Sequence, residues 1–232
     1  MILAAALLTA IGIADVARAS DTRASKQQRV RSWMLAAAAV VTLAWGLGQP
    51  IWTAAIGMAI VAAWLIMTPV RRTATWAVAG LAVALTVLVV APAVATDGPF
   101  MNWLNSAAPP MFQQLTFAHL ATAVGGFVFL INTAKIVVRV VIARTDIDDA
   151  TKPQPLRGGR YLVPSERILI LALGLAGQFG AIGAVVGAKS IIRFPEISGS
   201  TDRGSTAEYF LIGSGLSWGL ALLMLAATTV AA

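Results

Sequence analysis

The chain has 232 residues, of which 58% are hydrophobic and only 12% are charged. A soluble domain has roughly 45–50% apolar and about 25% charged residues. A chain of this length has too little interior to hide the apolar excess from water. The composition therefore excludes a disordered chain and a small disulfide-stabilised domain, and it predicts a protein embedded in a lipid bilayer.

The excess of basic residues, the lack of cysteine and the single histidine limit which ligands and which chemistry the sequence allows. The chain carries 17 Lys and Arg against 10 Asp and Glu. Because no basic stretch is mixed with aromatic residues as in a single-strand binder, we expect no nucleic acid and instead anionic headgroups on the cytoplasmic side. The lack of cysteine excludes thiolate catalysis, Cys-ligated zinc and iron–sulfur clusters. One histidine cannot build a metal site, and we expect no metal or other cofactor.

Seven apolar runs follow one another along the chain, and most approach the roughly 20 residues that a helix needs to cross a membrane. They cover about residues 2–17, 33–49, 51–68, 74–95, 115–138, 168–188 and 209–230. The first is the shortest, and its basic residues follow it, whereas a secretory signal peptide carries them in front. The sequence predicts an all-α bundle of about seven transmembrane helices. A bundle of six, with residues 2–17 lying flat in the membrane interface, is the alternative.

Basic residues indicate the orientation of these helices. The predicted loops 18–32, 69–73 and 139–167 hold 13 Lys and Arg, whereas the loops on the other side hold 3. The positive-inside rule places the basic loops in the cytoplasm, the N-terminus outside and the C-terminus inside. Within one membrane domain, residues 1–143 then form the first five helices, 144–165 a cytoplasmic linker and 166–232 a C-terminal hairpin.

The sixth predicted helix, residues 168–188, has one broad face almost without side chains. Close packing of a second helix on this face is the favoured interpretation, because small residues let backbones approach in lipid. An unwound, substrate-lined break at residues 177–180 is the alternative. The last predicted helix offers a matching pair of glycines. The residues assigned to helix packing are Gly174, Gly177, Gly180, Gly183, Gly215 and Gly219.

Polar residues within or beside the predicted helices are candidates for binding a substrate or a lipid headgroup. Asn132, Lys135 and Arg139 lie at i, i+3 and i+7 on one face of the fifth predicted helix. Extension of the two bases to the cytoplasmic headgroups is the favoured interpretation, and an anionic site for a substrate or lipid headgroup is the alternative. Gln178 lies near the middle of the sixth predicted helix, where a buried amide needs a hydrogen-bond partner. The remaining candidates are Arg157 and Arg160, which flank two glycines of the linker.

A charged cluster is predicted where the sixth helix leaves the membrane on the outer side. Lys189 and Arg193 are four residues apart, and Glu208 opens the last helix. If the last two helices pack through their glycines, we expect Glu208 to form a partly buried ion pair with one of the two bases.

The last third of the chain carries a set of short motifs. They are Gly159-Arg160, Glu166–Ile170, Ala176-Gly177-Gln178, Ala188–Phe194 and Ala207–Gly213. Together they resemble the C-terminal segment of a family of uncharacterised bacterial multi-pass membrane proteins, over about residues 130–220. Ser214 stands where that family has Thr. The resemblance implies a bacterial inner-membrane protein and brings no activity with it.

Three functions remain open from the sequence. No HExxH, GxSxG or phosphate-binding glycine motif occurs, so an enzyme is the less favoured class. The favoured function is an accessory or scaffold subunit of a membrane complex, whose partner is another membrane protein or a second copy. A transporter or channel for a small solute or anion, and a lipid-binding or lipid-handling protein, are the alternatives.

Overall fold

The structure is a computed structural model of the whole chain, and it describes residues 1–18, 26–90, 97–113, 115–144, 159–199 and 203–231. This part of the chain is all-helical and contains no strand, which confirms the predicted fold class at that level. The helices are α1 (Ile2–Ala17), α2 (Lys26–Gly46), α3 (Ile51–Met67), α4 (Arg71–Val90), α5 (Pro99–Ser106), α6 (Pro110–Gln113), α7 (Phe117–Ile131), α8 (Thr133–Ile142), α9 (Gly159–Leu175), α10 (Phe179–Gly199) and α11 (Arg203–Val230).

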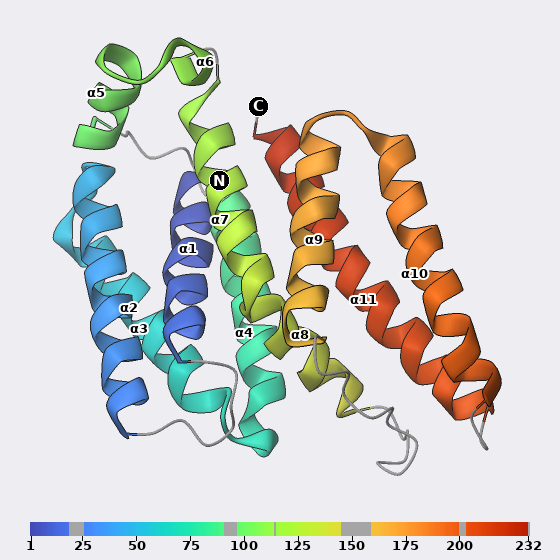
Figure 1. Cartoon of the computed structure of the whole chain (residues 1–232). Coiled ribbons are helices and arrows are strands. Elements are labelled where there is room, and N and C mark those ends of the chain that lie inside the picture. The colour runs from blue at the N-terminus through green and yellow to red at the C-terminus, as the bar shows by residue number, and fades with distance from the viewer. Residues whose placement is uncertain (19–25, 91–96, 114, 145–158, 200–202, 232) are drawn as a thin grey trace.

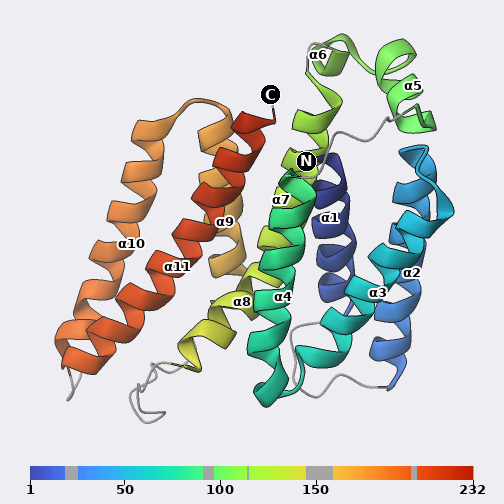
Figure 2. The same cartoon turned by 180° about the vertical axis from the view of Figure 1, so that it is seen from behind.

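The long helices run up and down the molecule, while the short helices α5 and α6 cover one end (Figure 1). Helix α1 begins and helix α11 ends toward this same end, as both views show (Figures 1 and 2). The sequence predicted the two termini on opposite sides. The difference arises because the chain makes one more turn than the apolar runs indicated.

That extra turn breaks the predicted sixth helix, 168–188, into the end of α9 and the start of α10. Gly177 has φ +71°, a left-handed conformation that favours glycine. The Gln178 amide donates to the Leu173 carbonyl at 2.8 Å, and the Gly177 amide donates to the Gly174 carbonyl at 3.0 Å. These two bonds form a Schellman motif, which ends a helix. Helix α10 then runs back beside α9 (Figures 1 and 2).

Helix α1 lies in the middle of the bundle, although it comes from the shortest apolar run. Leu7, Leu8, Ile11 and Ala14 are buried in it, and it packs against α2, α3, α4, α7 and α8. A Cβ atom on Gly12 would lie 2.9 Å from the backbone of Val128 in α7, so only glycine allows this approach. Residues 2–17 therefore belong to the packed core of the bundle, and the alternative in which they lie flat in the membrane interface stays a prediction.

Two hydrophobic clusters meet at α1. One cluster joins α1 to α2, α3 and α4, and it includes the buried side chains of Ile11, Val61 and Leu81. The other joins α7, α9 and α11, and it includes Leu130 and Ile170. Leu8 of α1 belongs to the second cluster while Leu7 belongs to the first, so α1 holds the two halves of the bundle together.

Helix length and apolarity give fewer candidate membrane spans than predicted. In the described residues, Arg72–Val90 and Ala207–Val230 are long and apolar enough to cross a bilayer. The pair α7 and α8 can act as a third span, bent by 54° at its break. Three further apolar helices, Ile2–Ala17, Ile51–Met67 and Phe179–Ile192, are shorter. The number of seven spans is thus not supported, whereas a helical chain with two or three candidate spans is.

Candidate functional site

A buried carboxylate ties together α1, α3 and α8 in the middle of the bundle. The Asp15 side chain, near the end of α1, is fully buried. Its Oδ2 atom accepts hydrogen bonds from Trp64 Nε1 of α3 at 3.0 Å and from Thr133 Oγ1 of α8 at 2.8 Å. Its Oδ1 atom accepts a bond from Arg18 Nη2 at 3.2 Å, which also forms an ion pair. Each carboxylate oxygen therefore has at least one donor.

The same cluster closes the C-terminal end of α1. Ser32 Oγ of α2 donates to the Ala14 carbonyl at 2.9 Å, and Asn132 Nδ2 donates to the Asp15 carbonyl at 3.0 Å. These carbonyls belong to the last turn of α1, where backbone donors run out. The Ala14 carbonyl also accepts from the Arg18 amide at 3.1 Å. Asn132 sits at the break between α7 and α8. The broken helix is thus held in place by the end of α1.

The predicted headgroup candidates do not form one site. Asn132 serves the Asp15 cluster, and Lys135 lies half-buried in the next turn of α8. Arg139 is exposed toward the other end of α8. Gln178 is exposed at the turn between α9 and α10, near the end of the molecule that carries α5 and α6 (Figure 1). Arg157 and the Arg160 side chain lie outside the described residues.

The predicted outer charged cluster is arranged differently from the expectation. Lys189 Nζ of α10 pairs with Glu166 Oε2 of α9, and both side chains are largely buried, 14% and 11% exposed. Lys189 Nζ also lies 5.4 Å from the ring centroid of Trp218 in α11. Glu208 is exposed, and no ion pair in the described part of the chain involves it. The Arg193 side chain lies outside the described residues.

The turn at Gly177 explains this exchange of partners. Because α10 folds back along α9, Lys189 comes to the level of Glu166, which lies 23 residues earlier in the chain. A single straight helix over residues 166–189 would have placed the two side chains at opposite ends.

Arg167, one residue after Glu166, is a second buried charge that the sequence analysis did not single out. Its side chain is 1% exposed, and its Nε atom donates to Ser217 Oγ of α11 at 2.6 Å. Its Nη1 atom is buried and has no acceptor among the described residues. The sequence carries two signals for it. Two charged residues stand at the start of one apolar run, and Ser214 and Ser217 interrupt the last apolar run.

The glycines assigned to helix packing fall into two groups. Gly174 packs closely, because a Cβ atom there would lie 3.1 Å from Leu225 Cγ and closer still to its methyl groups. At the other positions, an added Cβ would meet nothing within 4 Å, and these positions are Gly177, Gly180, Gly183, Gly215 and Gly219. The larger residues on the opposite face, such as Leu171 and Ile182, pack inward instead. The small-residue faces of α10 and α11 therefore point out of the fold.

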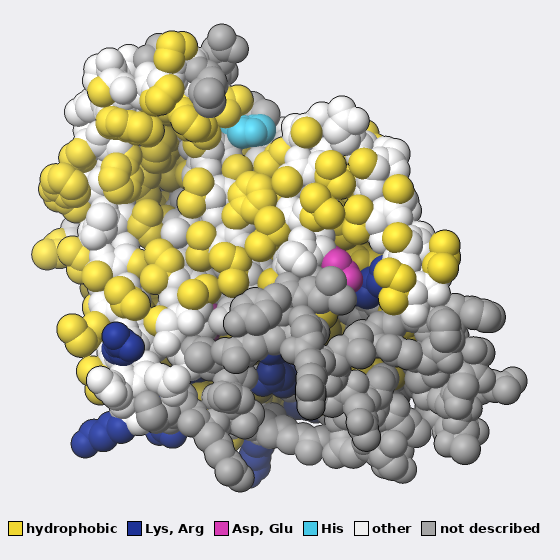
Figure 3. Space-filling view, viewed as in Figure 1, with side chains coloured by type: hydrophobic (Ala, Val, Ile, Leu, Met, Phe, Trp, Pro, Cys, Tyr) yellow, Lys and Arg dark blue, Asp and Glu magenta, His cyan; other side chains and the backbone are white. Residues whose placement is uncertain are grey.

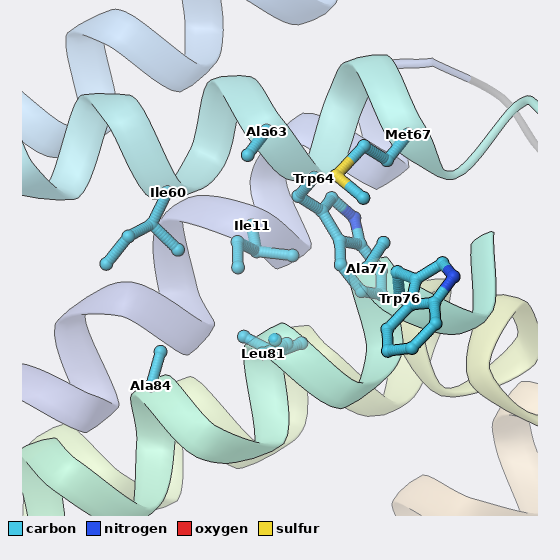
Figure 4. A pocket seen from close by; sticks show the side chains of 10 residues that line it. Ile11, Ile60, Ala63, Trp64, Met67, Trp76, Ala77, Leu81 and Ala84 are labelled. Carbon is cyan, nitrogen blue, oxygen red and sulfur yellow. The ribbon is translucent and has the colours of Figure 1, made fainter. Parts of the chain in front are cut away.

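An apolar cavity of about 180 Å³ lies between α1, α3 and α4. Figure 4 shows Ile11, Trp64 and Leu81 around it, with Trp76 at one side. The Trp64 nitrogen is bonded to Asp15, so the indole separates this cavity from the carboxylate. The lining is of hydrophobic side chains and one glycine, which offers no charged group to select a polar ligand.

Comparison with known protein families, with curated proteins and with solved structures finds no match. A proposal on function therefore rests on the residues of this chain. Within them, no group of three or more His, Cys, Asp or Glu is placed to hold a metal ion.

Proposed function

We propose that the chain is a multi-pass protein of the inner membrane, with its basic end in the cytoplasm. On the face that Figure 3 shows, hydrophobic side chains are spread over the described surface, and most of the visible Lys and Arg side chains lie toward the end opposite α5 and α6. The exposed bases at this end include Arg29 and Arg31 of α2, Arg72 of α4 and Arg144 beyond α8. The positive-inside rule then supports both termini on the outer side.

Cysteine labelling tests this orientation, because the chain has no cysteine of its own. Asn105→Cys in α5 and Gln178→Cys in the turn after α9 should react with an impermeant thiol reagent in intact cells. Arg144→Cys should react only after the membrane is opened. The reverse pattern contradicts the orientation, and a Gln178→Cys that never reacts contradicts the turn.

Within the membrane, the chain acts as an accessory or scaffold subunit that binds a transmembrane helix of a partner. The outward glycines of α10 are the observation that carries this proposal. Gly180, Gly183 and Gly187 recur on one exposed face of the helix, and an added Cβ at each would meet nothing within 4 Å. Their neighbours on that face include Ala184 and Ala188, which are also exposed.

These glycines make no close contact with the part of the chain that the structure describes, so they add nothing to its packing. Each glycine in a helix costs about 1 kcal/mol relative to alanine. Gly174 offsets this cost by close packing against Leu225, whereas the three glycines of α10 do not. In lipid, a glycine face lets a second helix approach closely, so that dispersion contacts and weak hydrogen bonds stabilise the pair. A partner helix therefore accounts for the glycines.

The substitution Gly183→Leu tests the proposal without disturbing the fold, since the new side chain would point into open space. We expect the variant to lose a partner that co-purifies with the wild-type chain in a mild detergent, while its own melting temperature is not lowered. The matched control is Ala82→Leu on α4, where an exposed small residue stands between large apolar ones. Ala82→Leu should keep the partner.

The variant Gly183→Cys identifies the partner through a crosslink formed in the membrane. A product of twice the chain mass of 24.1 kDa means a second copy, and any other mass means a different subunit. The proposal fails if the wild-type chain elutes alone from every mild detergent, or if Gly183→Leu retains the partner as well as Ala82→Leu does.

A further inference from the structure

Arg167 is a charged side chain placed deep within the helical bundle. It lies in α9 among the largest fully buried side chains of the described structure, beside Ile170 and Leu171. Its hydrogen-bond partner Ser217 lies near the middle of the candidate span Ala207–Val230. Charged residues at such depth are costly, and they usually mark a site that handles an ion or a polar ligand.

The hydrogen-bond donors of Arg167 are only partly used. The Nε atom donates to Ser217 Oγ at 2.6 Å, but the buried Nη1 atom has no acceptor among the described residues. A guanidinium presents its donors in a planar fork that suits two oxygens of a phosphate or carboxylate. A buried donor without an acceptor costs free energy that an incoming oxygen would remove.

The charges around Arg167 are also unequal. Glu166 is already paired with Lys189, so the three charged residues together carry one positive charge too many. Lys189 lies over Trp218, which brings the third helix, α11, into the cluster. An unpaired charge in an apolar interior is strongly unfavourable. One anion between α9, α10 and α11 would balance both the charge and the unused donor.

We propose that Arg167, with Ser217 and Lys189, forms a binding site for one phosphate group between α9, α10 and α11. Arg167 supplies the fork of donors, Ser217 fixes its orientation through Nε, and Lys189 supplies a second positive charge. Glu166 competes with the phosphate for Lys189. The phosphate is either a free anion or the headgroup of a lipid. This site is independent of the glycine face of α10, and it stands if that proposal fails.

The experiment measures binding by the whole chain in a neutral detergent. One arm follows radiolabelled inorganic phosphate by equilibrium dialysis. The other arm follows lipid that the protein retains after delipidation, with phosphatidylglycerol compared against a neutral glucosyl diacylglycerol. Binding in the first arm identifies a free anion, and retention of phosphatidylglycerol alone identifies a headgroup.

Arg167→Gln should weaken the binding of the retained probe by roughly tenfold or more, since it removes a charge-assisted hydrogen bond. Glu166→Gln should instead strengthen binding several-fold, because it removes the competing carboxylate. A purely structural role for the cluster would not raise affinity in this way. Should Arg167→Gln fail to fold, Glu166→Gln and the serine variants still decide the question.

The two buried serines of α11 are the matched pair. Ser217→Ala should weaken binding several-fold because Arg167 loses its orienting contact, whereas Ser214→Ala, on the same buried face, should not change binding. If the wild-type chain binds neither probe, or if Arg167→Gln and Glu166→Gln bind as the wild type does, the proposal is overturned.

Discussion

The molecule has two buried polar clusters, one at Asp15 and one at Arg167, and they differ in how many of their hydrogen bonds are made. At Asp15, both carboxylate oxygens have donors, and the neighbouring carbonyls of α1 are bonded to Ser32 and Asn132. At Arg167, one bond to Ser217 is made, while a buried nitrogen has no acceptor among the described residues. A cluster with all its hydrogen bonds made stabilises the fold, whereas an incomplete one has a donor that a ligand can satisfy.

The region around α1 and the region of α10 and α11 also differ in how their glycines pack. Around α1, Gly12 and Gly125 allow close contact with the facing helix, since a Cβ atom on either would come within 3 Å of the backbone there. On α10 and α11, five glycines face outward, namely Gly180, Gly183, Gly187, Gly215 and Gly219. In the first region most glycines pack within the core, and Gly80 of α4 is the exception. The second holds them on its surface, where another molecule can use them.

The largest expected effect is that of Asp15→Ala. The substitution leaves Trp64 Nε1 and Thr133 Oγ1 without their acceptor and leaves Arg18 without its counter-ion. Removing one partner of a buried ion pair typically costs about 3–5 kcal/mol. We expect a loss of this size in the free energy of unfolding, measured by titrating the detergent-solubilised protein with a denaturing detergent.

Asp15→Asn is the control that separates charge from hydrogen bonding. Its amide oxygen can still accept from Trp64 or Thr133, so the loss should be clearly smaller than for Asp15→Ala. If Asp15→Ala unfolds at the same point as the wild type, the cluster does not hold α1 in place, and the contrast with Arg167 disappears.

One pair of turns shows how far the sequence predicted the fold. After α2, Gly48 has φ +65°, and the Gln49 amide donates to the Ala44 carbonyl at 2.8 Å. After α9, Gly177 and Gln178 repeat the same geometry. The sequence revealed the first turn because Pro50 follows it. The second has Phe179 in that place. The sequence therefore favoured a continuous helix there, with a break at residues 177–180 as the alternative.

The sites were harder to predict because they depend on these turns. Residues of the Asp15 cluster come from four helices, α1, α2, α3 and α8, and from the α7–α8 break. The apolar runs give no information on which of these segments meet. The pairing of Lys189 with Glu166 follows only once α10 folds back on α9. The sequence did predict the all-helical class, the break after α2 and the separation of basic from apolar segments, all of which depend on local composition.

A smaller effect compares the two kinds of glycine directly. Gly174→Leu would place a side chain against the buried Leu225 of α11, and overpacking of this kind typically costs about 1–3 kcal/mol. Gly183→Leu removes the same flexible residue type from an open face, where it should leave thermal stability unchanged or slightly higher. Melting curves in detergent measure both variants. Equal destabilisation would mean that α10 is packed on its glycine side.

The smallest effect tests which carboxylate pairs with Lys189. Because the Glu166 and Lys189 side chains are mostly but not fully buried, a double-mutant cycle with Glu166→Gln and Lys189→Met should give a coupling of about 1 kcal/mol, above the median of surface pairs. The same cycle with Glu208→Gln is the control, and it should give a coupling near zero because Glu208 is exposed on α11. The free energies of unfolding come from the same detergent titration. A coupling to Glu208 but none to Glu166 would mean that residues 166–189 form one continuous helix, and it would remove both the turn at Gly177 and the cluster around Arg167.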